Sequence, residues 1–190
     1  RQRQMCIRDR IGAIVPDIEN PFFSELAKAV EDEAYKNGYR IMLCNSGDDL
    51  EKEMANIQMF QQLQADGIII TTNCAETGRI LKNCPVPAVL VDCKLDNIGE
   101  HAFVEADNYQ GGCLATQHLL ECGSKKIVCM KEPTGYSSGR KRYKGYADVC
   151  KKYGLKERIV DCCYDYESGL RAAEEILKKY PEADLSLIHI

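Results

Sequence analysis

The feature that most constrains the fold is a regular alternation between short, wholly apolar runs and longer segments whose apolar residues recur at helical spacing. The run IGAIV, for example, ends at Pro16 and is followed by FFSELAKAVEDEAYKN before Gly38. These two patterns predict a strand and then a helix. Strands that are apolar throughout are buried on both faces, which helices on each side of a parallel sheet provide. The sequence therefore predicts an α/β fold with doubly wound parallel sheets.

The alternation continues along most of the chain. The expected strands cover residues 11–15, 39–44, 67–71, 87–92, 102–107, 126–130 and 158–163. The expected helices cover residues 22–37, 49–64, 75–83, 108–121, 139–152 and 167–179. Gly123 is expected to stop the helix that begins at Asn108, because glycine commonly follows the last turn of a helix.

Composition excludes several classes of protein. The chain has 190 residues, of which 45% are hydrophobic and 28% charged, so it lies in the globular range. Its net charge is -4, and only one basic cluster stands out, at residues 140–144, which argues against a nucleic-acid-binding surface. No apolar run reaches the roughly 18 residues of a membrane span. The N-terminal RQRQMCIRDR lacks the apolar core of a secretory signal, so we expect a soluble protein without membrane partners.

Eleven cysteines raise the question of disulfides or a metal site. No C-x-x-C pair is present, and zinc sites need paired ligand spacing. Several cysteines, such as Cys44 and Cys129, occupy apolar strands where a small buried residue belongs. We therefore expect reduced thiols, no metal, and a reducing cytoplasm, where disulfides are rare.

Polar and aromatic residues follow the expected strands, and ligands of open α/β sheets lie beyond the carboxyl ends of the strands. After the first strand, Asn20 is a plausible N-cap and Pro21 a plausible first helical residue. Phe22 and Phe23 come next and cannot both face the buried side of that helix. Either one ring is in the core and the other is partly exposed, or both form an apolar wall for a ligand.

The chain contains, in this order, IVPDIENPFF, NGYRIMLCNSGDD, ADGIII, VPAVLVD, VEADNYQGGCLATQHLLECGSKKI, GRKRYKGY and YESGLRAAEEIL. This series closely resembles the LacI (lactose-repressor) family of transcriptional regulators over about residues 11–184. It resembles more weakly the periplasmic sugar-binding proteins that share the fold. The resemblance implies a periplasmic-binding-protein-like type I fold: two α/β lobes joined by a hinge, with a small effector such as a sugar or nucleobase in the cleft.

The resemblance also implies a domain organisation. We expect the N-terminal lobe to cover residues 11–123 and an incomplete C-terminal lobe to cover residues 124–184. Residues 1–10 and 185–190 do not fit the family pattern, so we expect truncation at both ends and non-family flanks. The alternative for residues 185–190 is that this apolar segment forms the next strand.

Residue by residue, the resemblance implies ligand contacts from Phe22, Phe23, Thr71, Asp92, Asp107, Arg142 and Tyr164. A sugar has hydroxyl groups and an apolar face, so charged groups and aromatic rings suit it. Arg142 could instead be a solvated helix residue. Asp107 could cap the helix that begins at Asn108, either instead of contacting the ligand or in addition to it. Many family members have arginine after the aspartate at position 92, whereas this chain has Cys93, which removes one basic contact.

The function that the resemblance implies is a cytoplasmic effector sensor that controls transcription. Operator DNA would be read by a helix-turn-helix headpiece absent from this chain, in a homodimer of the intact protein. The first alternative is a periplasmic sugar-binding protein of an ABC transporter. The second is an α/β enzyme, but neither G-x-G-x-x-G nor G-x-x-x-x-G-K-[ST] follows a strand, and His101, His118 and His189 lack a nucleophile at recognisable spacing. We therefore expect no catalysis and no cofactor.

Overall fold

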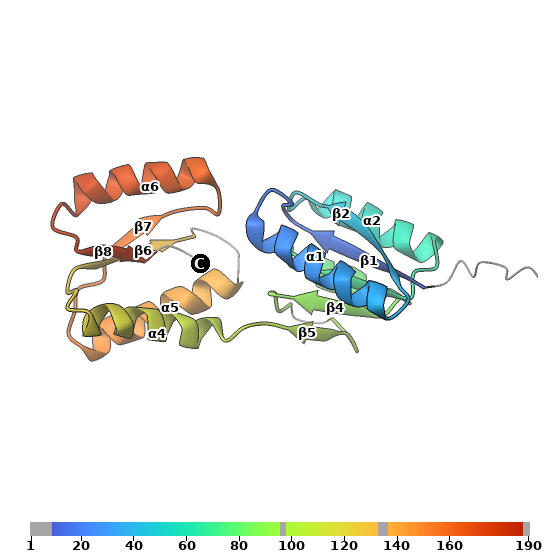
Figure 1. The fold of residues 1–190 in the computed structure, drawn as a ribbon, viewed down its shortest axis with the longest axis horizontal. Helices are drawn as coiled ribbons and strands as arrows, with labels where there is room; N and C mark the ends of the chain where they lie inside the picture. Colours follow the sequence, from blue (N-terminus) through green and yellow to red (C-terminus); the bar gives the residue numbers. More distant parts are fainter. Residues whose placement is uncertain (1–8, 96–97, 133–136, 188–190) are drawn as a thin grey trace, which may run out of the picture. The chain divides into compact units, whose positions relative to one another are not determined.

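A computed structural model describes residues 9–95, 98–132 and 137–187. The chain divides into two compact units, the first ending at Glu105 and the second beginning at Ala106. Each unit contains its own parallel β-sheet with helices packed on it (Figure 1). The structure therefore confirms the α/β fold class with parallel sheets in two units.

The first unit has a five-stranded sheet in the order β2-β1-β3-β4-β5. Its elements are β1 (Arg10–Val15), α1 (Pro21–Lys36), β2 (Arg40–Asn45), α2 (Leu50–Gln62), β3 (Gly67–Ile70), α3 (Thr77–Lys82), β4 (Ala88–Val91) and β5 (Ala102–Val104). All neighbouring strands are parallel. Their carboxyl ends therefore share one edge, with β1, β3 and β4 at its centre.

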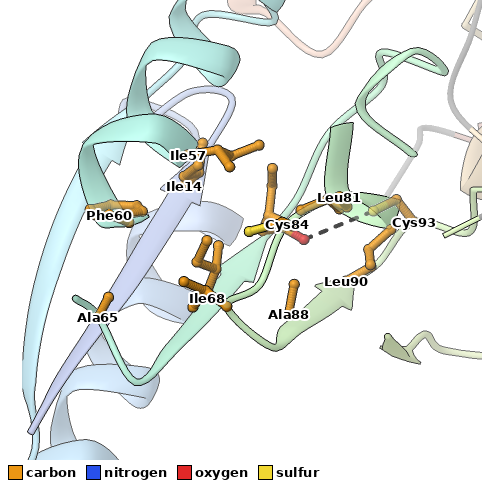
Figure 2. Packing of buried hydrophobic residues seen from close by; sticks show 12 residues of the cluster. Ile14, Ile57, Phe60, Ala65, Ile68, Leu81, Cys84, Ala88, Leu90 and Cys93 are labelled. Carbon is orange, nitrogen blue, oxygen red and sulfur yellow. Dashed lines mark hydrogen bonds between the residues drawn. The ribbon is translucent and has the colours of Figure 1, made fainter. Parts of the chain in front are cut away.

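The main core of the first unit lies between this sheet and helices α2 and α3 (Figure 2). Ile14, Ile68 and Leu90 come from three adjacent strands and are at most 1% exposed. Ile57 and Phe60 of α2 are fully buried against them. Each such buried side chain contributes about 1.5–3 kcal/mol. This packing holds α2 on the sheet and thereby fixes the start of the helix at the carboxyl edge.

The second unit has a three-stranded sheet in the order β7-β6-β8, and its strands are also parallel. Its elements are α4 (Asn108–Glu121), β6 (Ile127–Lys131), α5 (Ser137–Lys152), β7 (Ile159–Asp161), α6 (Tyr166–Lys179) and β8 (Leu185–Leu187). The presence of β8 agrees with the alternative that the segment from residue 185 forms the next strand. Residues 188–190 lie outside the described part.

The boundary between the units differs from the sequence prediction, because α4 belongs to the second unit and not to the first. Helix α4 packs closely on α5 at two glycines. A Cβ atom on Gly112 would overlap the backbone of Arg142, and one on Gly145 would overlap the backbone of Tyr109. The boundary therefore lies before α4, at residues 105–106, rather than at Gly123. Sequence periodicity identified the helix but not its packing partner.

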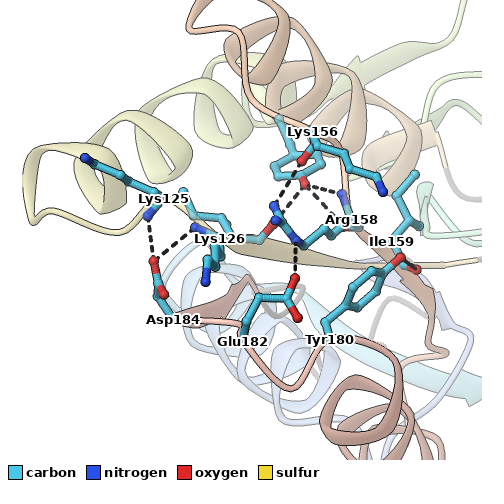
Figure 3. A network of polar contacts seen from close by, with 10 residues as sticks. Lys125, Lys126, Lys156, Arg158, Ile159, Tyr180, Glu182 and Asp184 are labelled. Carbon is cyan, nitrogen blue, oxygen red and sulfur yellow. Dashed lines mark hydrogen bonds and ion pairs between the residues drawn. The ribbon is translucent and has the colours of Figure 1, made fainter.

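The order β7-β6-β8 of the second unit repeats the order β2-β1-β3 of the first, so that β6 corresponds to β1 and β8 to β3. In each unit, an aspartate just before β3 or β8 accepts hydrogen bonds from the start of β1 or β6. The Asp66 carboxylate accepts hydrogen bonds from the backbone N–H of Asp9 (2.7 Å) and Arg10 (3.1 Å). The Asp184 carboxylate accepts them from Lys125 (2.7 Å) and Lys126 (3.0 Å), as Figure 3 shows.

These backbone hydrogen bonds hold the pKa of the Asp184 carboxyl below its ordinary value. Arg158 adds an ion pair with Glu182 at 3.4 Å beside the same edge of the sheet (Figure 3). We call the Asp66 and Asp184 contacts the aspartate clamps. They fasten the amino-terminal edge of each sheet, opposite the edge at which the strands end.

The glycine contact between α4 and α5 gives a prediction. Gly112→Ala should lower the free energy of unfolding of the second unit by about 1–3 kcal/mol, because the added methyl group meets backbone that cannot move aside. Gly111→Ala is the matched control, since the space around Gly111 is open. It should raise stability by up to about 1 kcal/mol, as alanine favours a helix. Urea unfolding followed by circular dichroism measures both, and equal stability of the two variants would contradict the packing described.

Candidate functional site

The sequence-predicted residues of the first unit lie at the carboxyl edge of its sheet. Thr71 directly follows β3, and Asp92 directly follows β4. Phe22 and Phe23 lie in the first turn of α1, the helix that follows β1. Because β1, β3 and β4 are neighbours in a parallel sheet, the topology brings all four residues to the same edge.

The two phenylalanines at the start of α1 differ in burial. Asn20 is the N-cap, as predicted, and its side-chain oxygen accepts a hydrogen bond from the backbone N–H of Phe22 at 3.0 Å. Phe22 is 49% exposed, whereas Phe23 is only 8% exposed. The rings meet edge to face with centroids 5.1 Å apart, a favourable aromatic geometry. Phe23 is therefore a core residue, and it supports the exposed ring of Phe22.

Thr71 is buried just beyond the last hydrogen bonds of β3. Its backbone N–H donates to Ile14 O at 3.0 Å, which continues the pairing with β1. Its hydroxyl oxygen is buried and has no hydrogen-bond partner in the described part of the chain. An unsatisfied buried hydroxyl is uncommon in folded proteins and costs about 1–3 kcal/mol.

Asp92 and Cys93 turn the chain away from β4. Asp92 has a φ of +54°, in the left-handed region that aspartate tolerates better than most residues. Its backbone N–H donates to Val104 O at 2.8 Å. Cys93 packs in the core at 5% exposure, and burial raises the pKa of its thiol to about 11. Position 93 therefore presents a neutral thiol to the core and no charge to the edge of the sheet.

Glu53 of α2 is a residue that the sequence analysis missed. It is fully buried, and its Oε2 accepts hydrogen bonds from the hydroxyls of Thr72 (2.7 Å) and Thr77 (2.5 Å). Burial raises the pKa of the Glu53 carboxyl, although the two hydroxyl bonds oppose this shift. The spacing of positions 53, 57 and 60 could have identified it, because this spacing places Glu53 on the same helix face as the apolar residues Ile57 and Phe60.

The start of α4 positions two polar residues in the second unit. Asp107 is the N-cap, and its carboxylate accepts a hydrogen bond from the backbone N–H of Gln110 at 2.9 Å. The prediction that Asp107 caps this helix is therefore confirmed. Asn108 is 8% exposed, and its Oδ1 accepts a hydrogen bond from Nε of Arg142 at 2.9 Å. Arg142 is partly buried, so it is not the solvated helix residue considered as its alternative.

Tyr164 follows β7 and lies close to the first turn of α5. A Cβ atom built on Gly139 would be 3.0 Å from the Tyr164 hydroxyl and 3.5 Å from Oε2 of Glu132. Glu132 directly follows β6 and is 7% exposed. Gly139 thus leaves room for an aromatic hydroxyl and a carboxyl beside the carboxyl ends of β6 and β7. Tyr164 was predicted from the sequence as a ligand contact, whereas Glu132 was not.

The remaining residues that could bind a metal or react are the histidines, the cysteines and the acidic residues. No group of three or more His, Cys, Asp or Glu that could hold a metal occurs among the described residues. The cysteines of residues 9–95, 98–132 and 137–187 are free thiols. The ring of His101 hydrogen-bonds to the backbone of Ala88 and Leu81, and Nε2 of His118 lies 3.7 Å from Sγ of Cys122, four residues further along the chain. No helix in these ranges has the length and apolarity to cross a membrane.

The different burial of the two phenylalanines gives a second prediction. Phe23→Ala should lower the free energy of unfolding of the first unit by about 3–5 kcal/mol, because it removes a buried ring. Phe22→Ala should change it by less than about 1 kcal/mol, since half of that ring already faces solvent. Urea denaturation compares the two variants. A larger loss for Phe22→Ala would show that the assignment of core and surface rings is reversed.

The buried Glu53 carboxyl gives a third prediction, on pH dependence. Its folded pKa is raised above 4.5, so the folded unit binds this proton more tightly than the unfolded chain does. The stabilisation from this group is fully present below pH 4.5 and is lost as the pH rises through the folded pKa. Glu53→Gln, which does not titrate, should gain stability relative to the unaltered chain as the pH rises. Parallel stability-pH curves for the two proteins would contradict the burial of this carboxyl.

Comparison with known proteins identifies the family. A family model described as periplasmic binding proteins and sugar binding domain of LacI family matches residues 8–189. The match therefore includes residues 8–10 and 185–189, which the motifs had left outside the resemblance. The ribose operon repressor of Halalkalibacterium halodurans is 34% identical over 175 residues, which are 92% of this chain and 52% of the repressor.

Two further proteins agree. Catabolite control protein A of Priestia megaterium is 33% identical over 178 residues, covering 89% of this chain and 52% of that protein. A periplasmic binding protein/LacI transcriptional regulator from Alkaliphilus metalliredigens, crystallised with D-xylulofuranose, is 31% identical with a TM-score of 0.78, covering 90% of this chain and 64% of the other. The chain spans about half the length of the curated relatives, which are named as repressors or control proteins and not as enzymes. The chain belongs to the LacI family and matches its sugar-binding domain.

Proposed function

We propose that this chain is the sensor through which a DNA-binding transcriptional regulator of the cytoplasm responds to a small sugar, and that the sugar is a pentose or pentulose. The observation that carries the proposal is the orientation of Arg142 by Asn108 at 2.9 Å. A guanidinium held in a defined direction can donate several hydrogen bonds, which suits a ligand with adjacent hydroxyl groups.

The other proposed contacts complement this arginine. The half-exposed ring of Phe22 offers an apolar surface for the carbon face of a sugar ring, and Phe23 supports it from the core. The buried Thr71 hydroxyl is a group that a ligand hydroxyl would satisfy. Asp92, Asp107 and Tyr164 supply further polar groups at the ends of strands and helices.

The names of relatives favour a five-carbon sugar over a nucleobase. Ribose operon repressors from several bacteria are among them, and a structural relative at 31% identity was crystallised with D-xylulofuranose. A furanose has hydroxyl groups on a small ring, so it needs both directional hydrogen bonds and a modest apolar contact. The proposed residues supply both kinds of contact.

Control of transcription follows as part of the same proposal. Operator DNA would be bound by a headpiece outside this chain, since the chain itself carries a net charge of -4. The intact protein would act as a homodimer. The sugar would change transcription by favouring one of two arrangements of the regulator, which requires unequal affinity for the two.

A periplasmic sugar-binding protein of an ABC transporter is the second candidate, because the matching family description covers such proteins as well. The genomic sequence upstream of residue 1 discriminates between the two. A helix-turn-helix pattern there supports the regulator, and a secretory or lipoprotein signal supports the transporter component.

The fourth prediction tests the sensor function by calorimetry. D-ribose or D-xylulose should bind the chain, while adenine and hypoxanthine should not. Arg142→Ala should weaken sugar binding by about tenfold or more, because a charge-assisted hydrogen bond contributes about 1.5–3 kcal/mol. Arg140→Ala is the matched control, since Arg140 lies on the same helix but is exposed.

Three results would overturn the proposal in different ways. Binding of a purine base but no pentose would replace the proposed effector. Equal sugar affinity of the Arg142→Ala and Arg140→Ala variants would remove Arg142 from the site. Turnover of any of these compounds would contradict a sensor that only binds.

A further inference from the structure

We propose that Glu53 is a positioning residue of the effector site, which fixes the loop after β3 and with it the Thr71 hydroxyl. We call residues 71–76, between β3 and α3, the β3–α3 loop. The proposal rests on the function proposed above, because it treats Thr71 as a ligand contact. Its own basis is a set of buried hydrogen bonds that converge on one carboxylate oxygen.

Glu53 is itself rigidly placed. It lies in the first turns of α2, and it is fully buried on the same face as Ile57 and Phe60, which are also fully buried. Asp49 caps this helix through hydrogen bonds to the backbone N–H of Glu51 (2.8 Å) and Lys52 (3.1 Å). The core packing and the cap therefore hold the Glu53 backbone against the sheet, so its carboxyl can serve as a fixed anchor.

The anchor joins the two ends of the β3–α3 loop. Oε2 of Glu53 accepts a hydrogen bond from Thr72, near the start of the loop, and another from Thr77, the first residue of α3. The Thr72 hydroxyl also accepts a hydrogen bond from the backbone N–H of Cys74 at 3.0 Å. Helix α3 has six residues and no side-chain hydrogen bond at its N-cap, Glu76. The bond to Glu53 therefore provides the side-chain fixation that this short helix otherwise lacks.

A second hydrogen bond to the β3–α3 loop is exposed to solvent. Nδ2 of Asn73 donates to Oδ1 of Asp48 at 2.7 Å, and this pair is exposed. Water competes with an exposed hydrogen bond, whereas a buried carboxyl and hydroxyl have no such alternative partner. Most of the resistance of the loop to movement should therefore come from Glu53.

Thr71 is adjacent to Thr72, so one peptide unit separates the anchored residue from the proposed ligand contact. A displacement of a binding group by about 1 Å is enough to impair recognition while the fold persists. A change at Glu53 should thus affect sugar affinity through the loop, although Glu53 itself need not touch the sugar.

Four variants test the inference. Glu53→Ala removes the anchor, and Glu53→Gln keeps a carbonyl oxygen that can accept both hydroxyl bonds. Thr77→Val removes one bond with little change in shape and serves if Glu53→Ala does not fold. Glu51→Gln is the matched control, because Glu51 is exposed two residues away on the same helix.

The first measurement needs no ligand. Amide hydrogen exchange at Cys74 and Thr77 should become about tenfold faster in Glu53→Ala, corresponding to about 1.4 kcal/mol of lost local protection. Thr77→Val should show the same direction, while Glu53→Gln and Glu51→Gln should stay within about twofold of the unaltered chain. Exchange that is unchanged in Glu53→Ala and Thr77→Val would overturn the role of Glu53 as an anchor.

The second measurement uses D-ribose and D-xylulose. Glu53→Ala should bind the sugar that the unaltered chain binds about tenfold more weakly, and Glu53→Gln should restore the affinity. Unchanged affinity in Glu53→Ala, despite faster loop exchange, would overturn the positioning role while leaving the sensor function intact. If neither sugar binds the unaltered chain, the proposed function fails. The link from Glu53 to an effector site then fails as well. The exchange measurement would still decide separately whether Glu53 fixes the β3–α3 loop.

Discussion

Parallel pairing of the strands determines where every candidate residue of this chain lies. In each sheet it brings the carboxyl ends of neighbouring strands to one edge, and the candidate residues stand at the turns and helix starts beyond that edge. The opposite edge is fastened by the aspartate clamps, in which Asp66 and Asp184 each bind two backbone N–H groups. The aspartate clamps thus fasten the strand starts at one edge, and the candidate residues lie at the other edge.

Neighbouring residues hold the candidate side chains at the carboxyl edges in place. Asn108 orients Arg142, and the close approach of α4 to α5 at Gly112 and Gly145 brings these two residues within hydrogen-bond distance. Phe23 supports Phe22 from the core. If these side chains contact a sugar as we propose, their limited freedom to rearrange would help them to discriminate between similar sugars.

The sequence was sufficient for the fold class, because strands that are apolar throughout require helices on both faces of a parallel sheet. It was also sufficient for the caps at Asn20 and Asp107, since capping depends on local residue type. It placed the unit boundary wrongly, because periodicity shows which face of a helix is buried but not which neighbour covers it. Glu53 was missed and the pairing of Asn108 with Arg142 was not predicted, because these roles depend on hydroxyl and guanidinium groups that lie 19 or more residues away in the chain.

We propose that the candidate residues at the carboxyl edges of the sheets contact a small sugar. Amide hydrogen exchange with and without saturating D-ribose or D-xylulose tests it most directly. Bound sugar should slow exchange at residues 71–74 and 92–93 of the first unit and at residues 107–112 and 137–142 of the second. It should cause no change beside the aspartate clamps at the opposite edges. Protection confined to one unit, or centred on the clamps, would contradict the proposal.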